Sequence, residues 1–508
     1  MSITWFIVVF VLYLIANFAI SYFAGRGAKT TTEFTLGKVG PVVLAFSFFA
    51  ARLSAGIYMG EPGILYTSGW PYAWVGILNA AFWTASILVV TRRMRAYAGS
   101  LGSLTVPEFL GQRYGSRFLR IWTCIGCSIF YILLMVAQYK GAVALFSTLF
   151  GLDKRFVIVA LSIISVLVVS TGGFKSVAWT TFFQGIIMIA VGVIIFLVAF
   201  KEVGWSFADV NTQLAQVDPN LARPFAESGL YSLGGVIALP FYLFISLVSN
   251  PYCNIRLMAM TDCSKKNFKK FSMTLISIGM ICFLLYCSGL FGRVLFPNLA
   301  DADSVIPTIA MTYLPNWLVA VVAVGLFAAL TSTVNSMLQT VSSMISIDLY
   351  KSNINKNATD KQVMTVNRIA TFVTILVVLF IAYFYMPDLL SMLSLIAGTG
   401  SGLVTFAPLL VGVCDTKSNQ GEDQYEDTSN HQSLFFRSIF SEERLVQICC
   451  EGAGCYQQLG ISSGDRSGDD RCKQKSTDAC REESSRHSNE YKFLISLSEQ
   501  FSAHNHSA

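Results

Sequence analysis

Hydroxyl side chains gather in one otherwise apolar stretch, GLFAALTSTVNSMLQTVSSMISIDLY, at residues 325–350. They include Thr331, Ser332, Thr333, Ser336, Thr340, Ser342 and Ser343. A desolvated alkali cation takes hard oxygen ligands, which hydroxyl groups and the carbonyl groups of a broken helix supply. Serine and threonine in apolar helices also bond back to their own helix or link neighbouring helices. The stretch alone therefore leaves a cation site and a purely structural role open.

Two more apolar stretches are interrupted by small, polar or proline residues. AFSFFAARLSAGIYMGEPG, residues 45–63, contains the charged residue Arg52. LPFYLFISLVSNPYCNIR, residues 239–256, contains Asn250 and Asn254 beside a proline. Backbone that leaves helical geometry at membrane depth is stable only when it is buried in protein or lines a cavity. Both interruptions therefore predict a binding site inside the membrane.

Arg52 is a fixed positive charge within an apolar stretch. At the bilayer centre such a charge costs at least about 2.5–3.5 kcal/mol, so it should face a cavity or a partner. One alternative is a structural pair with Glu61, and the other is a two-pronged contact to the carboxylate of an anionic solute. Lys140, in VAQYKGAVALF, either shares that role or extends toward the membrane interface. Two intramembrane cations favour an organic anion.

The composition indicates which solvent surrounds these stretches. Of the 508 residues, 54% are hydrophobic and only 13% are charged, and the mean hydropathy is +0.57. Such a chain is too apolar for a soluble fold and is typical of a multi-pass membrane protein. Eleven apolar stretches are about long enough to span a bilayer. They are residues 4–24, 41–60, 71–91, 120–149, 156–171, 180–200, 231–250, 271–292, 314–345, 366–386 and 389–414.

The two ends of the chain differ in character. Placing the N-terminus outside puts most loop Lys and Arg residues on the cytoplasmic side, as the positive-inside rule requires. The first stretch lacks a basic start and a cleavage site, so we expect it to remain as a span. Residues 1–414 form the transmembrane core of about eleven helices, and the polar residues 415–508 are expected to be a disordered cytoplasmic tail.

The tail holds all four histidines and five cysteines. The core therefore lacks imidazole ligands, and the cysteine spacing matches no paired zinc pattern. Nothing in the chain indicates catalysis or nucleic-acid binding, so we expect neither an enzyme nor a nucleic-acid partner.

From about residue 5 to 414 the chain resembles the sodium/solute symporter family. In that family A-x-x-[LIM]-S supplies two backbone carbonyls to a sodium ion, and A-x-x-S-[ST] supplies a third carbonyl and two hydroxyls. Here these patterns are Ala50-Ala51-Arg52-Leu53-Ser54 and Ala329-Leu330-Thr331-Ser332-Thr333. The resemblance implies a sodium site made by Ala50, Leu53, Ala329, Ser332 and Thr333. Weaker matches follow the same order: Gly172-Gly173-Phe174-Lys175, Gln184, Asn250-x-Tyr252-x-x-x-Arg256, and VIPT at 305–308.

The resemblance also implies a fold and an activity. The fold is an all-α polytopic membrane protein, with an extra N-terminal helix and two inverted five-helix repeats whose broken first helices face each other. The activity is sodium-coupled import of a small organic solute by alternating access, with sodium as the only metal ion. We expect the solute to contact Arg52, Ser54, Gln138, Lys140, Asn250, Tyr252 and Asn254.

The chain departs from the family pattern at informative positions. Many relatives carry an acid at the position of Arg52, and commonly an aspartate at that of Thr181; both acids are thought to help cations enter or leave. Sugar-carrying relatives place an acid and an amide just after the position of Ser54, where Gly56 and Ile57 stand here. The pattern is closer to the pantothenate, proline and monocarboxylate carriers, and we expect a carboxylate such as pantothenate.

Two alternatives belong to other classes of protein. A membrane sensor on a symporter-like core would account for the unusual C-terminal segment, but that segment has no kinase histidine motif and no glycine-rich nucleotide loop. A passive channel is disfavoured, because a cation site next to broken helices suits alternating access better than continuous conduction.

Overall fold

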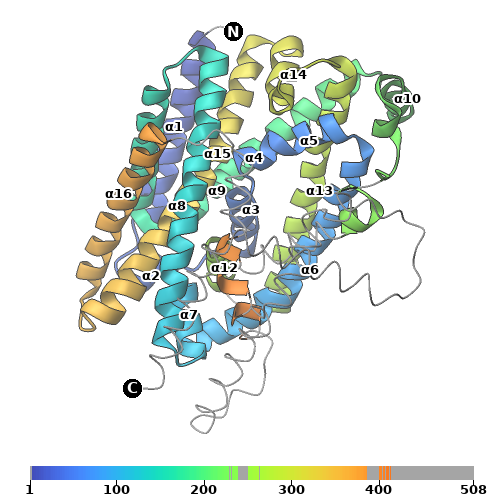
Figure 1. Cartoon of the computed structure of the whole chain (residues 1–508). Coiled ribbons are helices and arrows are strands. Elements are labelled where there is room, and N and C mark those ends of the chain that lie inside the picture. The colour runs from blue at the N-terminus through green and yellow to red at the C-terminus, as the bar shows by residue number, and fades with distance from the viewer. Residues whose placement is uncertain are drawn as a thin grey trace, which may run out of the picture. The chain divides into compact units, whose positions relative to one another are not determined.

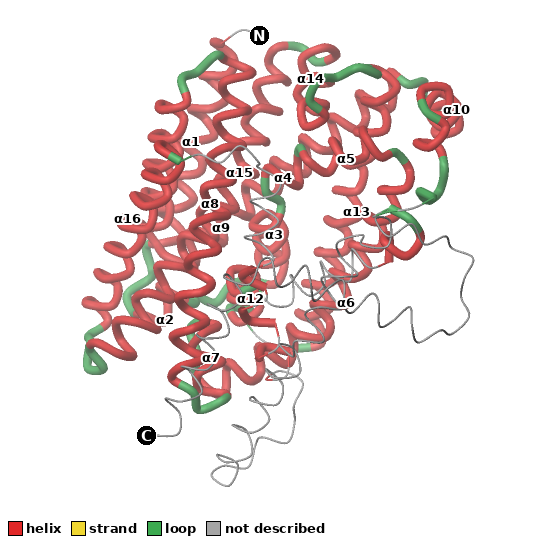
Figure 2. The backbone as a smooth tube through the Cα atoms, viewed as in Figure 1, coloured by secondary structure: helices red, strands yellow, loops and turns green. Residues whose placement is uncertain are grey.

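The computed structural model describes residues 3–227, 229, 231–237, 250–261, 264–385, 400–402, 404–406, 408–410 and 412. These residues form helices and no strand, apart from one isolated parallel bridge between Val39 and Met260 (Figure 2). The helices are α1 (Ile3–Gly25), α2 (Thr31–Thr35), α3 (Pro41–Arg52), α4 (Ala55–Tyr58), α5 (Gly60–Ser68), α6 (Trp70–Leu101), α7 (Val106–Arg113), α8 (Arg117–Phe150), α9 (Lys154–Glu202), α10 (Phe207–Val217), η1 (Pro219–Ala222), α12 (Pro251–Met258), α13 (Lys265–Leu295), η2 (Ala302–Ser304), α14 (Val305–Tyr313), α15 (Asn316–Met344), η3 (Ile345–Ile354) and α16 (Asp360–Phe384).

Six helices in the described part of the chain are long and apolar enough to cross a membrane. They are α1, α8, α9, α13, the continuous α15–η3 and α16. Their outer faces are apolar: Leu12 and Ile15 of α1 are each 61% exposed. Lipid rather than water suits such faces, because a helix satisfies its own backbone groups and can present apolar side chains to hydrocarbon. The predicted all-α membrane fold is confirmed.

Most of the predicted spans coincide with helices. The stretches at 4–24, 120–149 and 271–292 each lie in one of the six, the stretches at 314–345 and 366–386 overlap two more, and 71–91 lies in α6. Large parts of the expected spans at 231–250 and 389–414, and the whole expected tail, fall outside the described residues. The chain divides into two units, residues 1–415 and 416–508, and every described helix belongs to the first.

The expected spans at 156–171 and 180–200 are joined in α9 with a sharp bend instead of a loop. Gly172 and Gly173 have non-helical dihedral angles, and φ of Gly173 is +59°. That left-handed conformation suits glycine, and a Cβ at Gly173 would lie 2.2 Å from the carbonyl oxygen of Phe34. The two predicted stretches therefore lie on either side of the bend, where two glycines suffice to turn the chain. The 49 residues of α9 far exceed the roughly twenty that span a bilayer, and each half alone is long enough for one crossing.

Helix α15 forms the centre of the packing. Every residue from Val322 to Met344 is buried, and the helix contacts α1, α3, α8, α9 and α16 (Figure 1). Hydroxyl groups on so buried a helix need hydrogen-bond partners. The hydroxyl-rich stretch is thus surrounded by protein on all sides.

Both interrupted stretches contain a helix boundary where the sequence predicts one. Helix α3 ends at Arg52, since Leu53 has φ −74° and ψ 77°, and α4 resumes at Ala55. Helix α12 begins at Pro251, directly after the extended residue Asn250. Proline suits a first helical position because its missing N–H would have no helical partner there. The inverted relation of two five-helix repeats stays a prediction.

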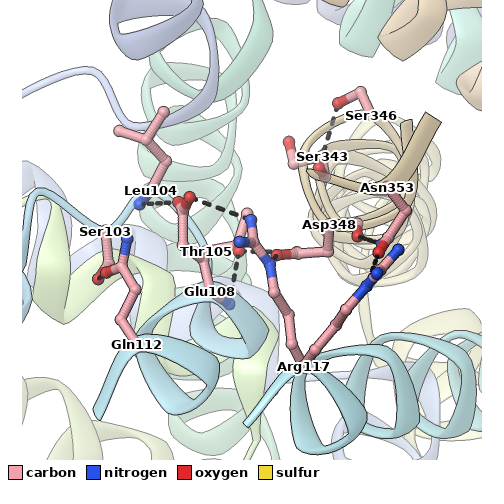
Figure 3. A network of polar contacts seen from close by, with 11 residues as sticks. Ser103, Leu104, Thr105, Glu108, Gln112, Arg117, Ser343, Ser346, Asp348 and Asn353 are labelled. Atoms are coloured by element: carbon pink, nitrogen blue, oxygen red, sulfur yellow. Dashed lines mark hydrogen bonds and ion pairs between the residues drawn. The ribbon is translucent and has the colours of Figure 1, made fainter. Parts of the chain in front are cut away.

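A polar network holds the end of α15 to α7 and α8 (Figure 3). The carboxylate of Asp348, in η3, accepts hydrogen bonds from Thr105 Oγ1 and Arg120 Nε, each at 2.7 Å. Arg120 Nη2 also pairs with Glu108 at 3.0 Å. Asn353 Nδ2 donates to the carbonyl oxygen of Asp348 at 2.7 Å. The helix that carries the hydroxyl-rich stretch is therefore fixed at this end.

Candidate functional site

The broken end of α3 lies against the hydroxyl-rich part of α15. Ser332 Oγ is 2.7 Å from the carbonyl oxygen of Ala50 and 2.9 Å from that of Ala329. Thr333 Oγ1 is 3.2 Å from the carbonyl oxygen of Ala51 and 3.1 Å from that of Ala329. All five residues are buried. Two hydroxyls thus bridge carbonyl groups of two different helices.

The geometry of α3 makes these carbonyl groups available. The last four carbonyl groups of a helix lack helical partners and carry the negative end of its dipole. Because α3 stops at Arg52, Ala50 and Ala51 belong to that last turn. The resulting set of hydroxyl and carbonyl oxygens is neutral and hard, which suits an alkali cation. The residues present therefore fit a sodium ion.

Four of the five predicted sodium ligands come together in this way: Ala50, Ala329, Ser332 and Thr333. The fifth, Leu53, is buried at the end of α3. The carbonyl group of Ala51 lies in the same cluster and was not among the predicted ligands. The side-chain pattern could not reveal it, because any residue type at that position offers the same backbone oxygen.

Tyr131 of α8 connects the predicted solute residues of α12. Its hydroxyl donates to Asn250 Oδ1 at 3.4 Å and accepts from the Tyr252 amide at 3.3 Å, which are long hydrogen bonds. The rings of Tyr131 and Tyr252 meet edge to face, with centroids 5.4 Å apart. Arg52 Nη1 donates to the Tyr252 hydroxyl at 3.4 Å, and Ser401 Oγ donates to Asn250 Oδ1 at 2.6 Å. Arg52, Asn250 and Tyr252 are therefore neighbours.

Tyr131 and Ser401 were not among the site residues predicted from the sequence. The chain has 20 tyrosines, and the predicted solute residues of the same helix, Gln138 and Lys140, lie seven and nine residues further along it. Ser401 follows glycines in a stretch without a recognised pattern. Only their contacts with Asn250 single them out.

The other predicted solute residues are placed differently. Gln138 is buried and lies seven residues after Tyr131, so both share one face of α8. Lys140 is nine residues after Tyr131, which is two and a half helical turns, and emerges on the opposite face. Ser54 lies at the break itself, and Asn254 is buried one turn after the start of α12.

Glu61 lies near the same break, in the first turn of α5. Its carboxylate accepts a hydrogen bond from the Tyr72 hydroxyl at 2.5 Å. It is also close enough to Arg52 for an electrostatic interaction between the two charges. A structural pair of Arg52 with Glu61 and a contact of Arg52 with solute both stay predictions.

A broken membrane helix whose carbonyl groups meet hydroxyls of a buried helix is the arrangement of a cation-coupled membrane carrier. The sequence profile of the Sodium:solute symporter family matches residues 34–421, and the chain belongs to this family. The predicted family is confirmed, and sodium is the coupling ion. The protein is a multi-pass membrane symporter of a small solute.

Known relatives include proline and pantothenate carriers. The chain is 28% identical over 403 residues to the high-affinity proline transporter PutP of Bacillus subtilis. This match covers 77% of this chain and 83% of that protein. It is 24% identical over 416 residues to the sodium/pantothenate symporter of Escherichia coli. This match covers 80% of this chain and 85% of that protein. A solved structure of a Na⁺-coupled sialic acid symporter has the same fold, with a TM-score of 0.70, 19% identity and coverage of 81% and 87%.

Proposed function

We propose that this symporter imports a small organic solute bearing a carboxylate, by alternating access. The observation that carries the proposal is the bridge made by Ser332 and Thr333 between the carbonyl groups of α3 and Ala329. A sodium ion among these oxygens would tie the broken helix to the buried α15. Sodium would thus favour one position of α3 over others, which is what coupling requires.

The sodium ion would be held by oxygens from both helices. They are the carbonyl oxygens of Ala50, Leu53 and Ala329 and the hydroxyl oxygens of Ser332 and Thr333. The carbonyl oxygen of Ala51, 3.2 Å from Thr333 Oγ1, is a further candidate. Each hydroxyl can turn its proton away and offer a lone pair to the ion. Because no carboxylate is in this set, the site suits a monovalent cation better than calcium or magnesium.

The solute carboxylate would meet the Arg52 guanidinium at the end of α3. Tyr252, Asn250 and Asn254 of the α12 segment, with Ser54 and Gln138, would supply the surrounding polar contacts. Lys140, on the opposite face of α8 from Tyr131, would not contact this solute and would extend its ammonium group toward the membrane interface. The carboxylate would also neutralise a positive charge close to the sodium site, so solute and sodium would bind cooperatively.

Pantothenate and proline are the two candidate solutes. Pantothenate is favoured by the sequence pattern and by the similarity to the sodium/pantothenate symporter of Escherichia coli. Proline is favoured by the similarity to PutP of Bacillus subtilis. Both molecules carry the carboxylate that Arg52 would recognise.

The proposed orientation places the N-terminus outside and residues 415–508 in the cytoplasm, because the Lys and Arg residues of the loops then lie mostly inside. The transport cycle includes no covalent step, so we expect no enzyme activity. Its partners are sodium, the solute and the lipid bilayer.

Uptake by liposomes that contain the purified full chain tests this function. Labelled pantothenate, L-proline, lactate and glucose are each supplied with an inward sodium gradient, and again with potassium in its place. We expect accumulation of pantothenate or proline only with sodium. Equal uptake in potassium would indicate a passive channel, and no uptake of any carboxylate would contradict the proposal.

A further inference from the structure

Arg256, in α12, is a buried charge to which the proposed transport cycle assigns no role. It is 1% exposed, although arginine is almost never buried without partners. The ion pairs of the described residues involve Arg120, Lys201 and Arg223, so Arg256 forms none there. Among the described residues, its guanidinium donates to neutral oxygens only. A charge held in this way needs an explanation beyond simple stability.

The guanidinium reaches three separate places at once. Nε donates to Ser47 Oγ of α3 at 2.9 Å, and Nη2 donates to Ser336 Oγ of α15 at 2.6 Å. Nη1 donates to the carbonyl oxygen of Tyr252, one turn earlier in α12 itself. Arg256 therefore joins the helix of the solute residues to the two helices of the sodium site.

The bond to Ser336 continues to a sodium-site residue. A guanidinium can only donate, so Ser336 Oγ accepts from Arg256 and its own proton is free to donate. Ser336 Oγ lies 2.6 Å from the carbonyl oxygen of Ser332. Ser332 in turn contacts Ala50 through its hydroxyl group. Two hydrogen bonds thus separate Arg256 from the backbone of a proposed sodium ligand.

The bond to Ser47 attaches Arg256 to α3 and, beyond it, to α9. Ser47 Oγ accepts from Arg256 and lies 2.7 Å from Thr181 Oγ1, whose hydroxyl donates to the carbonyl oxygen of Val177 at 2.7 Å. Ser47 lies three residues before Ala50 on α3. The position of α12 is therefore linked to both sides of the proposed sodium site.

We propose that Arg256 is a positioning residue that couples solute binding to sodium binding. This inference rests on the proposed function, in which the solute contacts α12. A solute that fixes α12 fixes the guanidinium, and through Ser47 and Ser336 it fixes the carbonyl and hydroxyl oxygens that hold sodium. By thermodynamic linkage, sodium then strengthens solute binding by the same factor.

Solute binding to purified protein at low and saturating sodium tests the proposal. The probes are labelled pantothenate and labelled L-proline, and choline chloride keeps the ionic strength constant. The quantity compared is the coupling factor, defined as the Kd of the probe at low sodium divided by its Kd at saturating sodium. The variants are Arg256→Gln, Arg256→Lys and Ser336→Ala.

Arg95→Gln is the matched control. Arg95 Nε donates to the carbonyl oxygen of Met260, just past the end of α12, at 2.8 Å. This variant removes a guanidinium that holds the same segment but, among the described residues, forms no hydrogen bond to α3 or α15. Its coupling factor should equal that of the wild type.

We expect the coupling factor to fall at least about fivefold in Arg256→Gln and Ser336→Ala. The coupling factor of Arg256→Lys should lie between those of these two variants and that of the wild type, because an ammonium group keeps the charge but lacks the planar fork of donors. A merely structural role would weaken binding equally at both sodium levels and leave the factor unchanged. That result in Ser336→Ala and Arg256→Lys would overturn the inference, even if Arg256→Gln fails to fold.

The two proposals fail in different ways. A wild type that takes up probe with sodium, together with variants of unchanged coupling factor, overturns the role of Arg256 alone. A wild type that shows no sodium-dependent uptake overturns the proposed function. A wild-type coupling factor of one would mean that sodium does not strengthen solute binding. That result also overturns the role of Arg256, because there would be no coupling for it to transmit.

Discussion

At the scale of single residues, the Ser332 and Thr333 hydroxyls are the groups most directly tied to sodium. Replacing both with alanine leaves the carbonyl groups of α3 without partners and removes two ion ligands. A hydrogen bond to a charged group contributes about 1.5–3 kcal/mol, and about 1.4 kcal/mol is a tenfold change in affinity. We therefore expect the sodium concentration for half-maximal uptake to rise at least about tenfold. Unchanged sodium dependence in liposomes would remove the site.

The Thr340→Ala variant is the control for that experiment. Thr340 Oγ1 donates to the carbonyl oxygen of Ser336 on its own helix, so its loss deletes a buried hydroxyl of α15 and removes no proposed ligand. Its sodium dependence should match the wild type.

Arg52 is the residue on which the class of solute depends. Arg52→Lys keeps the charge but loses the two-pronged geometry, so we expect about tenfold weaker solute binding. Arg52→Gln loses the charge as well and should weaken binding further and reduce cooperativity with sodium. Isothermal titration of purified protein at low and high sodium measures both effects. Equal affinity of wild type and Arg52→Gln at both sodium levels would mean that Arg52 is a structural charge.

At the scale of helices, the network of Figure 3 holds η3 to α7 and α8. Asp348→Asn keeps the shape but removes the negative partner of Arg120, whose Nε lies 2.7 Å from the carboxylate. Removing one member of a buried pair costs about 3 kcal/mol or more. We expect a clearly lower melting temperature in detergent. Arg117→Gln, at an exposed residue that bonds Asn353, should change it little.

The bend of α9 gives a second prediction about a helix. Gly173→Ala forces a left-handed conformation on a side chain and brings Cβ 2.2 Å from the Phe34 carbonyl oxygen. The conformation alone costs about 1–3 kcal/mol, and the clash adds to it. We expect reduced yield of folded protein, measured by size-exclusion chromatography. Gly27→Ala, where nothing lies within 4 Å of the new Cβ, should behave like the wild type.

At the scale of the whole molecule, every residue of the candidate site lies within residues 1–415, the first of the two units. The polar composition of the second unit predicts that it adds little to the transport core. We therefore expect a chain ending at Cys414 to insert into the membrane and to keep sodium-driven uptake. A truncated chain that is degraded or inactive in liposomes would show that the tail is structural.

The sequence by itself determined the membrane character and most of the spans. Span length and apolar composition are local properties, so α1, α8, α13, α15 and α16 appear close to their predicted positions. The hydroxyl-rich stretch was also visible, because side-chain types are a local property, whereas its interpretation as a sodium site came from the resemblance to the symporter family. The interruptions at Arg52 and Asn250 marked helix boundaries for the same reason.

Only the tertiary structure decided which groups meet. Ser332 and Ala50 are 282 residues apart in the chain, and the periodicity of apolar residues within a helix cannot predict such a pairing. The carbonyl group of Ala51 has no side-chain signature, and the role of Tyr131 arises only from its contacts with α12. The links from Arg256 to Ser47 and Ser336 likewise depend on helix packing. The type of a side chain determines which hydrogen bonds it can form, whereas the fold determines which group becomes its partner.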